Sequence, residues 1–244
     1  MKRKIACITG ASRGIGRAIA LCFARDGYDI VLNCKNSVTQ MDALQREIEE
    51  TYSVQCIGIC ADVSVPEQVE GMFEEIFSRF GEIDVLVHNA GISFFGLISD
   101  MTALQWQSVI NTNLSSAFYC CKQVIPSMVA KKGGRILMIS SIWGNCGASY
   151  EAAYSAAKGG LNTFTKALAK ELAPSNIPVN AIACGVIDTE MNAHLSPEEL
   201  QTLIDEIPAC RLGTPEEVGN FALLLAHAPE YLTGQIITFD GGLL

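Results

Sequence analysis

Short apolar runs alternate with amphipathic stretches along almost the whole chain, and this alternation limits the folds it can adopt. Strands that are apolar throughout are typical of a parallel sheet buried on both faces. Helices between them provide the long crossovers that parallel strands need. The pattern predicts an α/β fold with a doubly wound parallel sheet and helices on both faces. The expected strands are 5–8, 30–33, 54–60, 83–88, 135–139, 179–183 and 236–239. The expected helices are 17–25, 41–51, 66–80 and 153–173, and 104–131 is expected to form one long helix or two joined helices.

The chain is expected to form one domain over residues 1–244. Its 244 residues, 49% of them hydrophobic, suit a single large α/β core, and no Pro/Ser-rich linker, repeat or low-complexity segment divides it. No apolar run reaches the ~18 residues that span a bilayer. Met1-Lys2-Arg3-Lys4 leads directly into the first strand rather than into a signal-peptide core. These features predict a cytoplasmic protein.

The net charge of −9 disfavours nucleic acid and anionic membranes as main partners, because both attract basic surfaces. The ten cysteines are scattered, with no C-x-x-C pair and no Cys/His ligand spacing, so no metal site is expected. They favour buried thiols in a reducing compartment. His88 ends an apolar strand pattern and is interpreted as structural.

A glycine-rich turn follows the first strand and precedes the first helix, and it reads Thr9-Gly10-Ala11-Ser12-Arg13-Gly14-Ile15-Gly16. Glycines let the backbone N–H groups approach a pyrophosphate, which the helix N-terminus attracts. A tight connection without a ligand is the alternative. The context favours dinucleotide binding, with contacts from Gly10, Ser12, Arg13, Gly14, Ile15 and Gly16.

The end of the second strand bears on which dinucleotide binds. An NAD site usually has an acidic residue there for the ribose 2′-OH, but residues 33–37 contain none. Lys35, together with Arg13, is placed to neutralise a 2′-phosphate, so we expect NADP(H); a solvated loop charge is the other interpretation of Lys35. Further along the cofactor, Asp62 and Val63 would meet the adenine. Asn89, Ala90 and Gly91 close the fourth strand where the backbone must pass the cofactor.

Tyr154 and Lys158 lie four residues apart on a predicted helix, which places both side chains on one face. An ammonium near a phenol favours the phenolate, so we expect Lys158 to lower the pKa of Tyr154. A phenol with a pKa nearer neutrality can donate and accept protons. The pair alone also fits an ordinary solvated helix face. Ser141, thirteen residues upstream of the tyrosine, offers a hydroxyl for a substrate oxygen.

Taken together, these motifs resemble those of the short-chain dehydrogenases/reductases, in order and spacing, over essentially the whole chain. The resemblance continues through residues 185–189 to Thr233-Gly234-Gln235 and Asp240-Gly241-Gly242. It implies a Rossmann-type fold with seven strands, a homotetramer, and hydride transfer between NADP(H) and a carbonyl or alcohol. Within the family, the chain looks most like the 3-oxoacyl-[acyl-carrier-protein] reductases of fatty acid biosynthesis.

The resemblance also assigns roles to individual residues. Tyr154 would protonate the carbonyl oxygen, while Lys158 would lower its pKa and bind the nicotinamide ribose. Ser141 would orient the carbonyl, and Asn113 would hold a water that links Lys158 to solvent. Gly185, Ile187 and Thr189 would meet the nicotinamide end of the cofactor.

Two departures from the family pattern affect the substrate. Cys184 stands where the family usually has proline; it is interpreted as a packed small side chain, with a redox-sensitive thiol as the alternative. An acidic carrier protein needs basic residues near the cleft, and Lys131, Lys132 and Arg135 are the candidates. With a net charge of −9, the chain would otherwise repel such a carrier.

A narrower resemblance competes with this assignment. Trp143 and Glu151 lie in segments similar to the elongation factor P 5-aminopentanone reductases, which reduce a ketone on a modified lysine of that factor. Trp143 would lie at the substrate mouth, and Glu151 would meet a terminal ammonium; packing and a surface charge are the alternatives. A dinucleotide-sensing regulator without activity is a third hypothesis. Such proteins typically lose the tyrosine or lysine, which this chain keeps.

Overall fold

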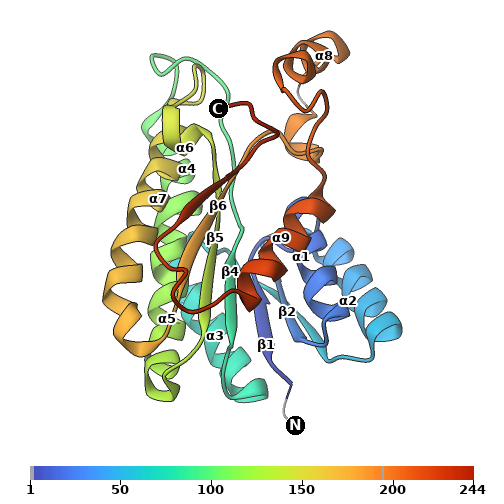
Figure 1. Cartoon of the computed structure of the whole chain (residues 1–244), viewed down its shortest axis with the longest axis vertical. Coiled ribbons are helices and arrows are strands. Elements are labelled where there is room, and N and C mark those ends of the chain that lie inside the picture. The colour runs from blue at the N-terminus through green and yellow to red at the C-terminus, as the bar shows by residue number, and fades with distance from the viewer. Residues whose placement is uncertain (1–2, 194) are drawn as a thin grey trace.

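The computed structural model describes residues 3–193 and 195–244, so Met1 and Lys2 of the basic start lie outside the described residues. The chain forms one seven-stranded sheet in the order β3-β2-β1-β4-β5-β6-β7, and all neighbouring strands are parallel. Figure 1 shows the sheet between two layers of helices. The strands are β1 (Ile5–Ile8), β2 (Asp29–Cys34), β3 (Cys56–Cys60), β4 (Val85–His88), β5 (Arg135–Ser141), β6 (Val179–Cys184) and β7 (Ile236–Phe239). The predicted doubly wound α/β fold of the Rossmann type is confirmed.

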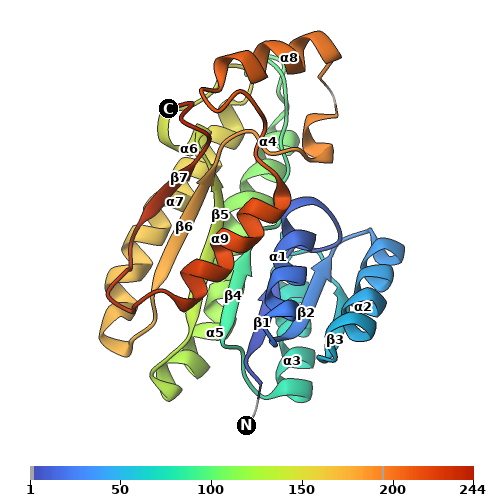
Figure 2. The same cartoon turned by 45° about the vertical axis from the view of Figure 1, so that its right-hand side comes forward.

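The helices divide between the two faces of the sheet and bury one core on each (Figures 1 and 2). One face carries α1 (Gly14–Arg25), α2 (Val38–Tyr52) and α9 (Pro215–His227). The other carries α3 (Pro66–Phe80), α4 (Ala103–Ile110), α5 (Ser116–Lys131) and α7 (Ala152–Leu172). Because both faces are covered, every residue of β1, β2 and β4 is buried, which explains why these runs lack polar alternation.

The strand order reverses at β1, which lies between β2 and β4. Chain segments leave the sheet in opposite directions at such a point, and a crevice opens beyond the carboxyl ends of the strands. The glycine-rich turn after β1, Asn89 after β4 and Ser141 at the end of β5 therefore lie along one edge of the sheet. The same topology places α8 (Pro197–Glu206) above this edge (Figures 1 and 2).

The structure decides between two expectations and differs from others. Residues 104–131 form two joined helices rather than one long helix; a π-helical turn, Asn111–Ser115, connects them, and Pro126 lies inside α5. The short helix α6 (Trp143–Cys146) was not predicted, because four residues are too few to show a helical period. β3 begins at Cys56 rather than at residue 54.

Two helices near this edge begin with reciprocal caps. Ser196 of α8 and Thr214 of α9 each accept a backbone N–H three residues on, and Glu199 and Glu217 bond back. Within residues 3–193 and 195–244, no helix has the length and apolarity needed to cross a membrane.

Candidate active site

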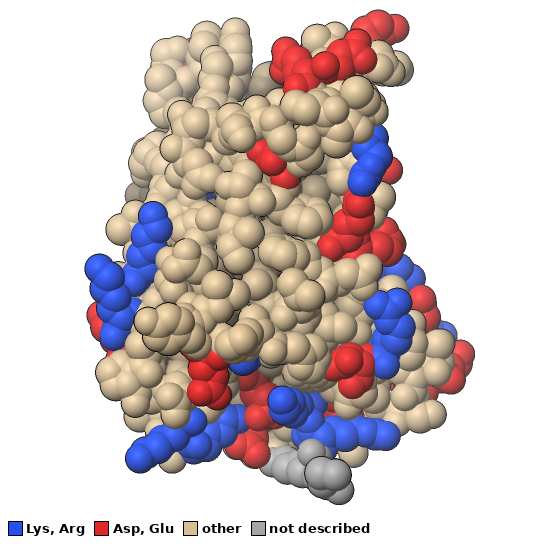
Figure 3. All heavy atoms as spheres, in the orientation of Figure 1, with Lys and Arg blue, Asp and Glu red and all other residues tan. Residues whose placement is uncertain are grey.

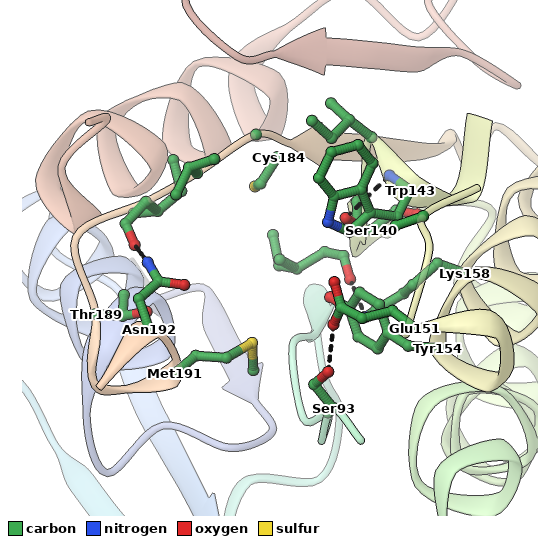
Figure 4. Close-up of a pocket in the computed structure, with 18 of the residues that line it drawn as sticks. Ser93, Ser140, Trp143, Glu151, Tyr154, Lys158, Cys184, Thr189, Met191 and Asn192 are labelled. Carbon is green, nitrogen blue, oxygen red and sulfur yellow. Dashed lines mark hydrogen bonds between the residues drawn. The ribbon is translucent and has the colours of Figure 1, made fainter. Parts of the chain in front are cut away.

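A cavity of about 540 Å³ opens at the carboxyl edge of the sheet, beside the point where the strand order reverses. Figure 4 shows side chains converging on it from β5, α7, the loop after β4 and the segment after β6. The cavity lining includes Ser141, Tyr154 and Lys158. Residues far apart in the sequence thus meet because parallel strands end at one edge.

Lys158 and Tyr154 lie on the buried side of α7, so the interpretation of a solvated helix face is wrong. Lys158 is 3% exposed and Tyr154 8%. The Lys158 ammonium donates a hydrogen bond to the backbone oxygen of Ile139 at 2.9 Å and lies 5.5 Å from the centre of the Tyr154 ring. It therefore sits beneath the phenol ring.

The predicted direction of the Tyr154 pKa is wrong for the protein alone. Burial raises the pKa of Tyr154 well above its usual value, and the charge of Glu151 adds to this effect, whereas a hydrogen bond with Ser141 opposes it. Burial also lowers the pKa of Lys158 to about 8. Helical spacing placed the two residues correctly but could not show how deeply the helix buries them. In this state the phenol is protonated at neutral pH.

Ser141 ends β5 and directs its hydroxyl into the cavity beside Tyr154. The hydroxyl accepts the backbone N–H of Trp143 at 3.2 Å, a contact made by the turn that starts α6. Its neighbour Ser140 instead donates to Asn162 at 2.6 Å inside the core. Both serines line the cavity but have different hydrogen-bond partners, and Ser141 is the one with a hydrogen bond to the tyrosine.

Asn113 lies in the π-helical turn and is completely buried. Its amide donates to the backbone oxygens of Ile92 at 2.8 Å and Val109 at 2.9 Å. Its Oδ1 atom has no hydrogen-bond partner among the described residues. A Cβ on Gly91 would lie 2.6 Å from this oxygen and 3.5 Å from Lys158 Nζ, so the glycine leaves the space between them open. A buried acceptor in this position suits a water between Asn113 and Lys158.

The glycine-rich turn packs tightly against the end of β4. Asn89 donates its amide to the backbone oxygens of Thr9 at 3.0 Å and Gly10 at 2.9 Å, and the Thr9 hydroxyl accepts the N–H of Ala90 at 3.1 Å. A Cβ on Gly16 would lie only 2.3 Å from the Gly10 oxygen. Asn89 thus holds the turn in place, a role that the sequence analysis did not identify.

The start of α1 fits a phosphate group. None of the described side chains caps its first turn, which contains no acidic residue. The unpaired N–H groups of a helix start, together with the helix dipole, attract anions. Gly14 has φ of +53°, and a Cβ on it would lie 3.4 Å from Thr189 Cγ2. Ile15 and Thr189 both line the cavity, whereas Ser12 is not among its lining residues. The residues present therefore fit the pyrophosphate of a dinucleotide.

Lys35 and Asp62 follow β2 and β3 and form an ion pair with a Nζ–Oδ2 distance of 2.7 Å. Asp62 also accepts the Ser64 hydroxyl, and these hydrogen bonds lower the pKa of its carboxyl despite its burial. Arg13 lies near Glu190, with a Nε–Oε2 distance of 3.3 Å. Both cations predicted to face a 2′-phosphate thus have carboxylate partners in the protein alone. Val63 is buried beside them.

The segment after β6 lines one side of the cavity, with Gly185, Ile187 and Thr189 all on its surface. A Cβ on Gly185 would come within 2.6 Å of Asp240, which explains the glycine. Cys184 is buried, and burial raises the pKa of its thiol to about 12. These properties match a packed small side chain.

Trp143 and Glu151 line the outer part of the cavity, on the side of α6 and α7 (Figure 4). The Glu151 carboxylate accepts a hydrogen bond from Ser93, 58 positions earlier in the chain. Of the described residues that line the cavity, Glu151 is the only carboxylate and Lys158 the only cation. Ser93 was not predicted, since no local pattern links it to Glu151.

The basic residues proposed for carrier-protein docking lie at the wrong end of the sheet. Lys131 ends α5, next to Lys132, and Arg135 begins β5, whereas Ser141 ends that strand roughly 20 Å away at about 3.3 Å per residue. Lys131 pairs with Asp84 at 2.7 Å, and Arg135 bonds the backbone oxygen of Ala228. In Figure 3 many Lys and Arg side chains gather at the lower end of the molecule, while Asp and Glu side chains gather at the upper end, where α8 lies.

His88 has the structural role expected from the sequence. Its ring is buried between the hydroxyls of Ser116 at 3.1 Å and Thr9 at 3.4 Å. Burial lowers its pKa to about 3, so it is neutral near pH 7. Within the described residues, no three His, Cys, Asp or Glu side chains are arranged to hold a metal ion.

Comparison with known proteins agrees with this geometry. Residues 4–200 match the family model of the short chain dehydrogenases. The chain is 39% identical over 241 residues to the 3-oxoacyl-[acyl-carrier-protein] reductase FabG of Staphylococcus aureus, covering 98% of both proteins. It is 39% identical over 244 residues to FabG of Aquifex aeolicus, covering 100% of this chain and 98% of the relative. It is also 38% identical over 240 residues to the uncharacterized oxidoreductase YmfI of Bacillus subtilis, again with 98% of both covered. The chain therefore belongs to the short-chain dehydrogenase family and is an oxidoreductase.

Proposed function

We propose that the protein is an NADPH-dependent carbonyl reductase, and that its substrate is a 3-oxoacyl group on acyl carrier protein. The observation that carries the reaction class is the meeting of Ser141, Tyr154 and Lys158 in one cavity beside the uncapped start of α1. The carrier-bound substrate is supported by full-length similarity to relatives with that name. We expect a homotetramer in the cytoplasm, as the resemblance implies.

Bound NADPH supplies the hydride, and the chain supplies the proton and the polar surroundings. Tyr154 donates its proton to the carbonyl oxygen, and its raised pKa keeps that proton in place until the oxygen becomes basic. The Ser141 hydroxyl orients and polarises the same oxygen. Lys158, mainly an ammonium at pH 7 because its pKa is about 8, stabilises the phenolate left behind. The free Oδ1 of Asn113 would hold the water that returns a proton towards Lys158.

The direct test is NADPH oxidation with acetoacetyl-acyl-carrier-protein as the ketone. The proposal expects turnover with this substrate, and a lower rate with the free acetoacetyl thioester. Absence of NADPH oxidation with either ketone would overturn the proposed function.

A second candidate is reduction of the 5-aminopentanone group on elongation factor P. It is favoured by one observation, that the only carboxylate among the described cavity residues is Glu151. A carboxylate suits a substrate with a terminal ammonium. The helix above the cavity is acidic as well, since α8 carries Glu198, Glu199, Asp205 and Glu206 without a Lys or Arg. An acidic carrier protein would be repelled there.

Steady-state rates on the two substrates distinguish the candidates. A tenfold or greater preference for modified elongation factor P would replace the carrier-protein assignment, and the opposite preference would remove the alternative. Glu151→Gln should lower the rate on the ammonium substrate selectively. Glu171→Gln, an exposed acid at the far end of the helix α7 that Glu151 precedes, is the matched control. Equal effects of the two variants would show that Glu151 does not recognise the substrate.

A further inference from the structure

Two cysteines lie side by side where β2 and β3 end. Cys34 is the last residue of β2 and Cys60 the last of β3, and they are register partners in the parallel ladder. Neighbouring strands are about 4.8 Å apart, and a disulfide needs a Cα separation of about 4.4–6.8 Å. Register partners also direct their side chains to the same face of the sheet. The backbone therefore brings these two thiols within reach of a disulfide.

The thiols are in contact and one of them is accessible. Cys60 is a side-chain hydrogen-bond partner of Cys34. Cys60 is exposed because β3 forms the edge of the sheet (Figure 2), whereas Cys34 is buried next to it. This combination gives a dissolved oxidant one sulfur to attack and places a second sulfur behind it.

The other cysteines do not share this arrangement. Cys7, Cys120 and Cys121 lie close enough to influence one another, but all three are buried in the core beyond the reach of a dissolved oxidant. Cys146 and Cys210 are exposed, but the contacts of their thiols among the described residues are with backbone oxygens and not with a second thiol. The pair at the ends of β2 and β3 therefore stands apart.

The pair is connected to the residues expected to recognise a 2′-phosphate. The Cys60 thiol donates a hydrogen bond to the backbone oxygen of Lys35 at 3.0 Å. The Lys35 side chain in turn pairs with Asp62, two residues after Cys60. A change at the sulfur atoms is thus passed directly to the loop that carries the lysine.

We propose that peroxide oxidises Cys34 and Cys60 to a disulfide, and that this disulfide weakens the binding of a 2′-phosphorylated dinucleotide. The effect on affinity rests on the proposed cofactor, whereas formation of the disulfide does not. The Cys60 sulfur attacks the peroxide, the O–O bond breaks, and a sulfenic acid and one water form. The Cys34 sulfur then displaces the hydroxyl as a second water. Two thiols are oxidised and one peroxide is reduced to two waters.

The disulfide affects the loop that carries Lys35, because its formation removes the hydrogen of the Cys60 thiol. A disulfide sulfur has no proton to donate, so the Lys35 carbonyl loses its bond from Cys60. The loop must then find another partner or move. We expect NADPH affinity to fall by roughly threefold to tenfold, the range for one lost hydrogen bond. NADH affinity should change less, because it lacks the phosphate that Lys35 would hold.

The experiment treats the full-length reduced protein with hydrogen peroxide and follows two readouts. Mass spectrometry after trypsin should show peptide 26–35, which contains Cys34, linked to peptide 47–79, which contains Cys56 and Cys60. Fragmentation of the linked peptide assigns the bond to Cys60. Titration with NADPH before and after treatment, and after a dithiol reductant, measures the change in affinity and its reversal.

Variants make the result specific. Cys60→Ser keeps a donor for the Lys35 carbonyl but cannot form the disulfide, so its NADPH affinity should not respond to peroxide. Cys210→Ser, which removes an exposed thiol elsewhere, should respond like the unchanged protein.

Each outcome is decisive. If no linked peptide appears, or if the bond joins Cys34 to Cys56, the proposal that Cys34 and Cys60 form a disulfide is wrong. A disulfide without a change in NADPH affinity would overturn the effect on the cofactor. If the reduced protein binds no NADPH at all, the proposed cofactor and the effect on its affinity are both wrong, while the peptide map still decides whether the pair forms.

Discussion

The floor of the cavity and its outer wall are built in contrasting ways. The layer at the base of the cavity, called the floor below, comprises Asn89 and Lys158, which line the cavity, and Thr9, Gly10 and Gly16, which pack behind Asn89. It is held by backbone and side-chain hydrogen bonds and has no room for extra atoms. Gly10 and Gly16 each have a neighbour closer than 3 Å to an added Cβ. Such a floor tolerates few changes, because overpacking and unpaired buried polar groups are both costly.

The outer wall comprises the side chains of Phe95, Trp143, Tyr150 and Met191 together with the acidic helix α8, and all of it is exposed or half-buried. Phe95 is 58% exposed and stacks on Tyr150 with ring centres 5.2 Å apart. None of the residues of α8, all of which are described, is buried. Side chains in such positions can be exchanged at little cost in stability.

The difference separates what the protein does from what it acts on. The floor brings Tyr154, Ser141 and the start of α1 together for any carbonyl that enters the cavity. The wall contacts the remainder of the substrate and can change without disturbing the floor. The reaction class is therefore better defined by this molecule than the identity of its ketone. The variants below test that separation.

Gly16→Ala should have the largest effect, because it disrupts the packing of the floor. Its Cβ would meet the Gly10 oxygen at 2.3 Å and the Asn89 amide at 2.5 Å. We expect the free energy of unfolding to fall by about 3 kcal/mol, the upper part of the range for overpacking. Urea unfolding measures it. Gly71→Ala is the control, since no described atom outside its own helix lies near that Cβ; it should stabilise α3 by about 0.5–1 kcal/mol. Similar results for both glycines would refute the tightly packed floor.

Lys35→Asp tests which residue distinguishes NADPH from NADH, with the next largest expected effect. Replacing a cation by an anion beside Asp62 should weaken NADPH binding by about 2 kcal/mol, roughly thirtyfold, and leave NADH almost unaffected. Fluorescence titration with each dinucleotide gives the ratio. Lys4→Asp, at the opposite end of the sheet, makes the same charge change as a control. An unchanged NADPH/NADH ratio would mean that Lys35 does not contact the 2′-phosphate.

Lys158 should give the floor a distinctive dependence on pH. Its pKa is lowered from 10.5 to about 8 in the folded protein. Between these two values the unfolded chain binds more protons than the folded one, so this group makes stability rise with pH across that window. Compared with Lys158→Met, the unchanged protein should gain about 2 kcal/mol between pH 8 and 10. Urea unfolding of both proteins at the two pH values provides the test, and parallel curves would contradict the burial of this charge.

Phe95→Ala should show how little the wall contributes to folding. The side chain is more than half exposed, so the free energy of unfolding should change by less than about 0.5 kcal/mol. The KM for the ketone should change, while the affinity for NADPH stays the same. A loss of NADPH affinity in this variant would show that the wall and the floor are coupled.

The sequence was a good guide where local pattern and structure coincide. Apolar strands, glycine spacing and the helical interval between Tyr154 and Lys158 placed the sheet, the turn and the pair. It was a poor guide to burial: the pKa of Tyr154 depends on how α7 packs, which its own residues do not encode locally. The contacts of Asn89 with the turn and of Ser93 with Glu151 join segments 79 and 58 positions apart. Lys131 and Arg135 were misplaced because charge was considered without the direction of β5.

The central claim, that Tyr154 is the acid of a carbonyl reduction on this floor, is tested most directly by Tyr154→Phe. The rate of NADPH oxidation with acetoacetyl-acyl-carrier-protein should fall by roughly 10²–10⁴-fold, while NADPH affinity stays within about twofold, since a hydroxyl is removed without altering the α1 start. A Tyr154→Phe enzyme that keeps the full rate at unchanged NADPH affinity would contradict the account.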